Sequence, residues 1–390
     1  MEKISMRAAV LATSLLIMSP IAVSPAVADM IAAFPRVNPN ITVWVVTMPS
    51  IAMVIFSLVY SRLVLFIAKR TLIAIAMTCF IIGGITPAFL NDIYLILAMR
   101  FVFGAGIGFL MPLSSGLVAD FYDGEMRAAM MGWQSAFVNF GGLLFMFTGG
   151  LLAAIHWNLT FFAYTIGFLV AAWVLFMLPE PKKAVQPESG PVSMPYPVFA
   201  LISGIFLFNI LFFALMTNAS VMISSENLGD ASQAGTVLTM FSVGGFFSGV
   251  MYGKTAKIFK RFTNTAGWSF TGIGMLIVGL SSYLPVIIVG TFLAGAGMAI
   301  TMPSYLIKIS QEAPASAISV AYAYTFVFVG VGQFISPIFF DGLIRLFDAA
   351  IGRFPILASA AILLSVALLQ LLLLAYKSRA DAGQGGNIYQ

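Results

Sequence analysis

The sequence Gly104-Ala-Gly-Ile-Gly-Phe-Leu-Met-Pro112 returns as Gly295-Ala-Gly-Met-Ala-Ile-Thr-Met-Pro303, at an offset of 191 residues. The basic pair Lys69-Arg70 returns at the same offset as Lys260-Arg261. Two separate matches at one period indicate that the chain contains an internal duplication. Because both long copies lie inside apolar runs, the duplicated unit is predicted to be a set of apolar helices.

The composition around this repeat is that of a membrane protein. Of the 390 residues, 61% are hydrophobic and 8% are charged, whereas about 25% of residues are charged in ordinary soluble domains. Such a chain cannot cover its outside with polar groups, so much of its surface is expected to face the lipid bilayer. The formal net charge of +5 comes from basic residues in short loops, so no nucleic acid partner is expected.

Twelve apolar runs are long enough to cross the bilayer, since one crossing takes about 20 apolar residues. Backbone polar groups have no water partner in lipid, so each run is predicted to be helical. The runs are Ala8–Ala33, Ile41–Tyr60, Thr71–Leu90, Ile93–Val118, Ala128–Ile155, Leu159–Leu178, Val198–Met222, Ala231–Tyr252, Thr263–Tyr283, Val286–Ile307, Ser316–Phe340 and Pro355–Tyr376.

The charges in the loops predict the orientation of these spans. With the N-terminus in the cytoplasm, the inner loops hold fifteen of the nineteen Lys and Arg residues, and the outer loops hold only Arg36, Arg345 and Arg353. We therefore expect both termini to be cytoplasmic. The short chain and tight loops are typical of a multi-pass protein of the bacterial inner membrane.

The first run also allows a second interpretation. Lys3 and Arg7 precede an apolar stretch that ends in Ala26-Val27-Ala28, which is the pattern of a cleavable secretory signal. The run is long for a signal, however, and an offset of 191 residues places it on the seventh run, Val198–Met222. We therefore predict a transmembrane helix that belongs to the duplicated unit.

The predicted fold class is an all-α integral membrane protein with two pseudo-symmetric six-helix halves around a central cavity. The halves are residues 1–178 and 198–376. Residues 179–197, rich in proline and charge, form a cytoplasmic linker, and residues 377–390 form a cytoplasmic tail. Parallel six-helix repeats of this kind are a plan of secondary transporters.

The fourth run and the loop after it resemble the major facilitator superfamily. The residues that carry this resemblance are Arg100-Phe-Val-Phe-Gly104, continuing to Pro112, then Asp120, Glu125, Arg127 and Gly132-Trp133. Leu178-Pro179-Glu180-Pro181 is similar to the family's usual exit from the sixth helix. The resemblance covers nearly the whole chain, and it implies a twelve-helix fold, alternating access and a protein that usually works as a monomer.

Two segments depart from the family pattern. Between the second and third spans, the resemblance places an acidic latch residue where this chain has Leu65, so the latch is expected to be weaker or built differently. The polar candidates for the cytoplasmic gate are Arg62, Lys69, Arg70, Asp120, Glu125 and Arg127. The family's antiporter pattern in the fifth helix is kept only at Gly141, Gly149 and Gly150.

Two charged residues lie well inside the predicted spans, Asp29 in the outer third of the first and Arg100 in the outer part of the fourth. A charge inside a membrane helix is costly, so each is a candidate functional residue. By resemblance, both helices line the cavity, and Arg100 matches a motif associated with proton coupling. We predict an Asp29–Arg100 pair in which Asp29 becomes protonatable when the two separate. Alternatively, Asp29 is the aqueous end of its helix and Arg100 extends to the interface.

Neutral polar side chains in the fifth, seventh and eleventh runs are candidates for contact with a substrate. They are Gln134, Asn139, Asn209, Asn218, Tyr322, Tyr324 and Gln333. Such side chains also join helices by hydrogen bonds, so both roles stay open. The 36 Phe and 22 Met residues favour an adaptable apolar cavity.

The leading hypothesis is a secondary transporter that exports small, largely apolar molecules, such as drugs or metabolites, in exchange for protons. The alternative is an importer or exchanger of organic anions in which Arg100 binds the substrate carboxylate. An enzyme is not expected, because the spans carry no HExxH motif, Ser–Lys dyad or paired acids. With one cysteine, Cys79, and one histidine, His156, no metal or other cofactor is expected. The expected partners are a small-molecule substrate, protons and the lipid bilayer.

Overall fold

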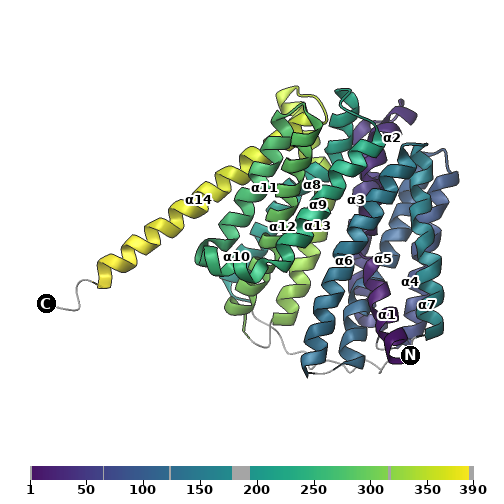
Figure 1. Cartoon of the computed structure of the whole chain (residues 1–390), viewed down its shortest axis with the longest axis horizontal. Coiled ribbons are helices and arrows are strands. Elements are labelled where there is room, and N and C mark those ends of the chain that lie inside the picture. Colours follow the sequence, from purple (N-terminus) through teal and green to yellow (C-terminus); the bar gives the residue numbers. More distant parts are fainter. Residues whose placement is uncertain (1, 65, 123, 178–193, 315–317, 386–390) are drawn as a thin grey trace.

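The computed structural model describes residues 2–64, 66–122, 124–177, 194–314 and 318–385. Within these ranges every regular element is a helix, and the long helices lie side by side as a bundle (Figure 1). The elements are α1 (Glu2–Leu15), η1 (Ser19–Ala26), α2 (Val27–Ala33), α3 (Pro39–Leu63), α4 (Lys69–Ile85), η2 (Thr86–Phe89), α5 (Ile93–Phe121), α6 (Gly124–Ala153), η3 (Trp157–Thr165), α7 (Ile166–Met177), α8 (Tyr196–Ser225), α9 (Ala231–Val250), α10 (Tyr252–Phe259), η4 (Lys260–Phe262), α11 (Thr263–Leu280), α12 (Leu284–Glu312), α13 (Ile318–Phe347) and α14 (Arg353–Gly385), where η marks a 3₁₀ helix.

The helices of the described chain are consistent with the predicted twelve spans. Ten helical segments of the described chain are long and apolar enough to cross a membrane. The helical segments Ala231–Val250 and Tyr252–Leu280 are long and apolar enough when they are taken together, and they are bent by 70° relative to each other. At a rise of 1.5 Å per residue, α9 and α11 are roughly 30 and 27 Å long. Both pack along α12. Counted separately they complete the twelve.

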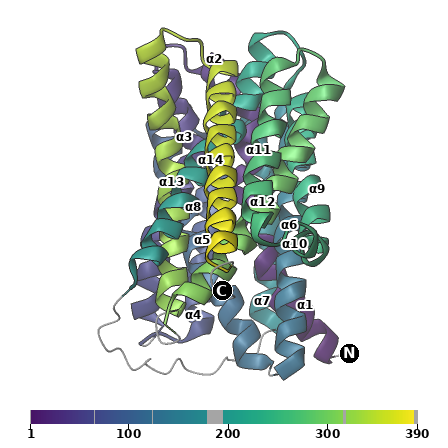
Figure 2. The same cartoon turned by 90° about the vertical axis from the view of Figure 1, so that its left-hand side faces the viewer.

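The two ends of the bundle differ in charge. The basic face, where α1 begins and α14 ends (Figures 1 and 2), carries Arg62, Lys69, Arg70 and the basic residues of α10 and η4. The opposite face carries Arg36, Glu226, Asp230 and Arg353.

The glycines of the repeated stretch allow close helix packing. A Cβ on Gly104 would lie 2.6 Å from the Cα of Pro49 in α3, and Gly106 approaches α4 in the same way. In the second copy, Gly295 meets α9 and Gly297 meets α11. Because real Cβ atoms essentially never come within 3.0 Å of such neighbours, each position excludes a larger side chain. Thus α5 and α12 pack in the same manner between two helices of their own half.

The first predicted span, Ala8–Ala33, is not one continuous α-helix. It consists of α1, the 3₁₀ segment η1 and the short helix α2. Pro20 and Pro25 lie at the start and the interior of η1, where their missing N–H groups remove α-helical hydrogen bonds. The span is nevertheless part of the core, since Ala9, Leu16 and Ala22 are fully buried.

The halves touch mainly toward the opposite face. η1 and α2 pack against α8, α6 packs against α9, and α3 packs against α13, whereas α1 packs on α5, α6 and α7 of its own half. The apolar core of the second half also takes in four first-half residues near the opposite-face ends of their helices, Val27, Val43, Val46 and Met146. The structure is therefore closed at the opposite face.

Candidate functional site

The break in the first span exposes backbone carbonyls that side chains from other helices bind. The Tyr164 hydroxyl donates to the carbonyl of Ser19 at 3.3 Å, and Arg100 Nη2 donates to the carbonyl of Pro20 at 2.9 Å. Inside a membrane, a carbonyl freed from helical bonding needs such a donor. Arg100 of α5 and Tyr164 of η3 therefore hold the break in place.

Arg100 is completely buried, and its donors are occupied by three different elements. Nε donates to the carbonyl of Val45 in α3 at 2.8 Å, and Nη1 donates to the Tyr164 hydroxyl at 2.9 Å. The guanidinium carbon also lies 4.5 Å from the centre of the Phe103 ring, within cation–π range. The alternative in which Arg100 extends to the interface is therefore wrong for this structure.

Asp29 lies at a cavity of about 170 Å³ between the two halves, close to the opposite face. The cavity is lined by Pro25, Ala28, Asp29, Ala153 and Ala154 of the first half and by Ser220, Ser224, Asp230 and Ala231 of the second. Ser220 of α8 bonds across the interface, because its hydroxyl donates to the carbonyl of Pro25 and accepts from the N–H of Ala28 at 3.4 Å. The cavity thus brings one carboxylate from each half to a shared space.

The predicted Asp29–Arg100 ion pair is absent. Arg100 bonds to Val45, Tyr164 and Pro20, and Asp29 makes none of the ion pairs found among the described residues. The physical reason is that the carbonyl of Pro20 in the break, the carbonyl of Val45 and the Tyr164 hydroxyl together supply the acceptors that the guanidinium needs. The charged partner that shares the cavity with Asp29 is Asp230 instead.

A chain of neutral polar groups joins the halves at mid-depth. The Ser50 hydroxyl of α3 donates to Gln333 Oε1 of α13 at 3.0 Å, and Gln333 Nε2 donates to Asn209 Oδ1 of α8 at 3.4 Å. Asn209 also donates to the carbonyl of Ile205 in its own helix. The structure thus brings together the predicted residues Asn209 and Gln333 and adds Ser50 to them.

Glycines bring α6 and α9 into close contact on the same side of the molecule as the cavity. A Cβ on Gly150 would lie 2.6 Å from the Cα of Gly235, and one on Gly142 would lie 3.3 Å from Ser242 Oγ. The neighbouring Gly149 faces the carbonyl of Ala22 in η1 instead. Of the two adjacent glycines of α6, Gly149 therefore contacts the first span and Gly150 contacts the other half.

The other predicted cavity residues lie in separate places. Gln134 donates to the hydroxyls of Ser114 and Ser115 in α5, each at 3.0 Å, and Asn218 donates to Thr217 Oγ1 and to a carbonyl of its own helix. The Tyr322 hydroxyl donates to the carbonyl of Leu306 in α12. Two further residues are a half-buried Asn139 on α6 and a 48% exposed Tyr324 on α13.

At the basic face, Lys69 and Asp120 form a largely buried ion pair at 2.7 Å. Arg70 donates to the carbonyl of Leu175 at 2.6 Å, and Arg62 is exposed. Glu125, Arg127, Leu65 and most of the linker 179–197 lie outside the described side chains. The pair ties the start of α4 to the end of α5 within the first half.

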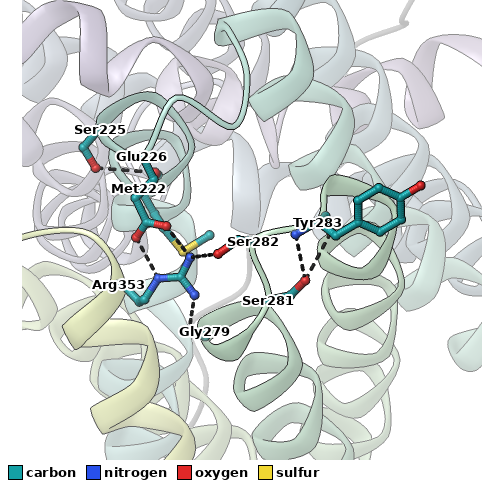
Figure 3. Close-up of polar contacts among 8 residues, drawn as sticks. All are labelled: Met222, Ser225, Glu226, Gly279, Ser281, Ser282, Tyr283 and Arg353. Carbon is teal, nitrogen blue, oxygen red and sulfur yellow. Dashed lines mark hydrogen bonds and ion pairs between the residues drawn. The ribbon is translucent and has the colours of Figure 1, made fainter.

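At the opposite face, Arg353 joins three helix ends of the second half (Figure 3). Its guanidinium pairs with both carboxylate oxygens of Glu226, which follows α8, and donates to the carbonyl of Gly279 in α11 at 2.6 Å. Ser282 also accepts from Arg353. Hydrogen bonding to Arg353 holds the pKa of Glu226 below its ordinary value.

The profile of the Major Facilitator Superfamily matches residues 9–337 and again residues 201–387. The chain belongs to the Major Facilitator Superfamily. Among solved structures, the D-xylose–proton symporter shares 16% identity, with a TM-score of 0.74 over 95% of this chain and 97% of that one. A bacterial homolog of the human lysosomal transporter Spinster shares 14% identity, with a TM-score of 0.68 over 94% and 96%. These likenesses support the fold, and family membership makes the chain a transporter and not an enzyme.

Two kinds of curated relatives match only part of the chain. The quinolone resistance protein NorA of Staphylococcus aureus is 27% identical over 119 residues, which are 30% of this chain and 31% of NorA. A triacylglyceride transporter of Mycolicibacterium smegmatis is 27% identical over 124 residues, which are 31% of this chain and 22% of that protein. The matched stretch thus spans less than a third of each relative.

Sequence reasoning missed Tyr164, Ser50 and Ser220. Pro20 and Pro25 were the available signal, because two prolines in one membrane span free carbonyls that need outside donors. The donors themselves come from spans distant in sequence, so no local pattern marks them.

Proposed function

We propose that this transporter exports small, largely apolar molecules in exchange for protons, by alternating access. The observation that carries the substrate class is the neutral chain Ser50–Gln333–Asn209, where the halves meet at mid-depth. Amide and hydroxyl groups can bond a neutral polar atom of a substrate, but they supply no counter-charge for an ion. Rocking of one half against the other about this contact would expose it to each side in turn.

The anion-carrier alternative receives less support. Arg100 would have to release the carbonyls of Val45 and Pro20 and the Tyr164 hydroxyl before it could hold a carboxylate. Each bond to a charged group contributes about 1.5–3 kcal/mol to stability. The arrangement therefore favours a structural role for Arg100 in the closed state, in which it fixes the break in the first span.

Asp29 is the candidate for proton coupling. Closure at the opposite face brings Asp29 of the first half and Asp230 of the second to one small cavity. Two carboxylates in a confined space repel each other when both are ionised, so a proton on Asp29 would favour closure. Opening of the opposite face would let Asp29 take up a proton there, and coupled export requires that Asp29 release this proton toward the basic face while the opposite face is closed.

The charge distribution supports a cytoplasmic location for the basic face, in the inner membrane of a bacterium. A proton entering from the opposite face would then supply about 1.4 kcal/mol per pH unit. A membrane potential of about 100 mV would add about 2.3 kcal/mol per charge moved. The name of the relative NorA, a quinolone resistance protein, favours export of drug-like compounds over uptake. We further propose that the chain works as a monomer.

Uptake into inside-out vesicles tests the substrate class. Vesicles with an imposed pH gradient, acid inside, are given a panel of labelled neutral apolar compounds and a matched panel of organic acids. The proposal predicts that neutral compounds accumulate and that an uncoupler abolishes the accumulation. Accumulation of the acids alone would instead identify an anion carrier.

A further inference from the structure

The loop between α9 and α11 carries basic side chains that the transport site does not use. The α10 basic patch consists of Lys254, Lys257, Lys260 and Arg261, and all four residues are exposed. Across the described residues, none of the four takes part in an ion pair, although the Arg261 guanidinium lies 4.9 Å from the ring of Phe262. The sequence has no Asp or Glu between Asp230 and Glu312. The patch is therefore not neutralised by its own segment.

The inner face of α10 packs on the bundle. The Tyr252 hydroxyl lies 3.3 Å from the hydroxyl of Ser304 in α12. The ring of Phe259 meets that of Phe270 in α11 edge to face, with centroids 6.0 Å apart. These contacts fix which side of the short helix points away from the protein.

The outer face of α10 combines charge with an exposed apolar side chain. Lys254 and Lys257 are exposed there, and Ile258 beside them is 74% exposed. The segment that begins with α10 turns by 70° from α9, so α10 runs across the long helices near the basic face (Figure 1). A helix across the spans, with lysines and an aliphatic residue on its outer side, is typical of the membrane–water interface.

The internal duplication explains why the basic residues of this loop have no acidic partner among the described residues. Lys260 corresponds to Lys69 of the first half, and Lys69 is paired with Asp120 at 2.7 Å. The position that corresponds to Asp120 is Gln311, which is neutral. Lys69 is 8% exposed in its pair, whereas Lys260 is exposed. The second half has therefore kept the basic pair without an acid at the position of Asp120, and the adjacent Glu312 takes part in none of the ion pairs found among the described residues.

We propose that the α10 basic patch binds the headgroup of an anionic phospholipid, whose phosphate supplies the negative charge that Asp120 supplies in the first half. Each Lys or Arg close to an anionic membrane surface contributes about 1 kcal/mol to binding, which is about a fivefold change in affinity. Ile258 lies beside the headgroup site, where it contacts the upper acyl chains. This binding depends neither on the transported substrate nor on which leaflet the basic face meets.

Energy transfer between α10 and labelled lipids tests the proposal on the full chain. A donor fluorophore is placed on Gly253→Cys in a Cys79→Ser background, since a Cβ at Gly253 meets nothing within 4 Å. The protein is reconstituted in phosphatidylcholine vesicles that contain a trace of acyl-labelled phosphatidylglycerol or acyl-labelled phosphatidylcholine. The ratio of the two transfer efficiencies reports enrichment of the anionic lipid near α10.

The expected ratio exceeds one in the parent protein, falls toward one in Lys257→Gln because the lipid affinity drops about fivefold, and reaches one when all four basic residues are Gln. A triple variant keeps the positive charge of the patch and should keep the ratio; it carries Lys254→Arg, Lys257→Arg and Lys260→Arg. Arg62→Gln removes one exposed cation from the first-half loop and should leave the ratio unchanged. An equal ratio for the parent and Lys257→Gln overturns the proposal. Loss of the enrichment on adding inorganic phosphate at constant ionic strength also overturns it, because the site would then bind soluble phosphate.

Discussion

Closure at the opposite face depends on the crossing of α6 and α9 at Gly150 and Gly235. In Gly235→Ala, the new Cβ would lie 2.6 Å from the Cα of Gly150. Carbon atoms pack best at about 3.5–4.0 Å, so the two helices must move apart by about 1 Å. Overpacking of this kind costs about 1–3 kcal/mol. The closed state alone bears that cost, because the two helices separate when the opposite face opens.

A destabilisation of 1–3 kcal/mol shifts the equilibrium from closed to open by about 5- to 150-fold. The shift can be measured with a reporter cysteine at Ala153, which lines the cavity between the halves and is only 3% exposed in the closed state. In a Cys79→Ser background, the rate of labelling by a membrane-impermeant maleimide from the opposite face reports how often the cavity opens. Gly235→Ala should raise this rate several-fold over the parent, up to the limit set by a fully open population.

Gly249→Ala is the matched control, because it lies on the same helix and its Cβ would meet nothing within 4 Å. It reproduces the gain in helix propensity on replacing glycine by alanine without the clash. Gly150→Ala should act like Gly235→Ala, since the two glycines face each other. Equal labelling rates in Gly235→Ala and Gly249→Ala would refute the reasoning that this crossing holds the closed state.

Three further predictions concern stability and specificity. Tyr164→Phe removes the acceptor of one Arg100 hydrogen bond in a fully buried site, so the free energy of unfolding should fall by about 1–3 kcal/mol, seen as a lower melting temperature in detergent. Glu226→Gln breaks the pair with Arg353. Because the pKa of Glu226 is lowered in the folded protein, the pair's contribution is complete above the ordinary value of 4.5 and is lost as the pH falls below it. The parent and Glu226→Gln should therefore differ in melting temperature at neutral pH and converge in acid; a constant difference would contradict this. Gln333→Leu should reduce vesicle uptake of substrates that carry an amide or hydroxyl more than uptake of pure hydrocarbons, and an equal loss for both would argue against a substrate contact.

The fold follows from features that a sequence displays directly. Apolar runs of membrane length predict the spans, and the repeat of Gly104–Pro112 at Gly295–Pro303 predicts two similar halves. The structure shows why glycine recurs in this repeat: at Gly104 and Gly295, α5 and α12 each approach a neighbouring helix closely. Such a close approach needs glycine at a defined position, so it can be recognised as a glycine pattern in the sequence.

The candidate site was predicted less well, because its partners come from different spans. Asp29 and Arg100 were recognised as charges inside the membrane, but their pairing was inferred from similar depth alone. The broken first span supplies the carbonyl of Pro20 to Arg100, and Asp230 reaches the cavity from the other half. Neither contact follows from hydropathy, since both depend on how the two halves lie against each other.

The most direct test of proton-coupled export is proton movement in inside-out vesicles that carry the full chain. A fluorescent pH probe follows the vesicle lumen while compounds that accumulated in the uptake assay are added, for the parent and for Asp29→Asn. The account predicts that each such compound triggers proton release in the parent and none in Asp29→Asn, although both still bind the compound. Substrate-triggered proton release that persists in Asp29→Asn would contradict the role of Asp29, and its absence from the parent would contradict proton exchange altogether.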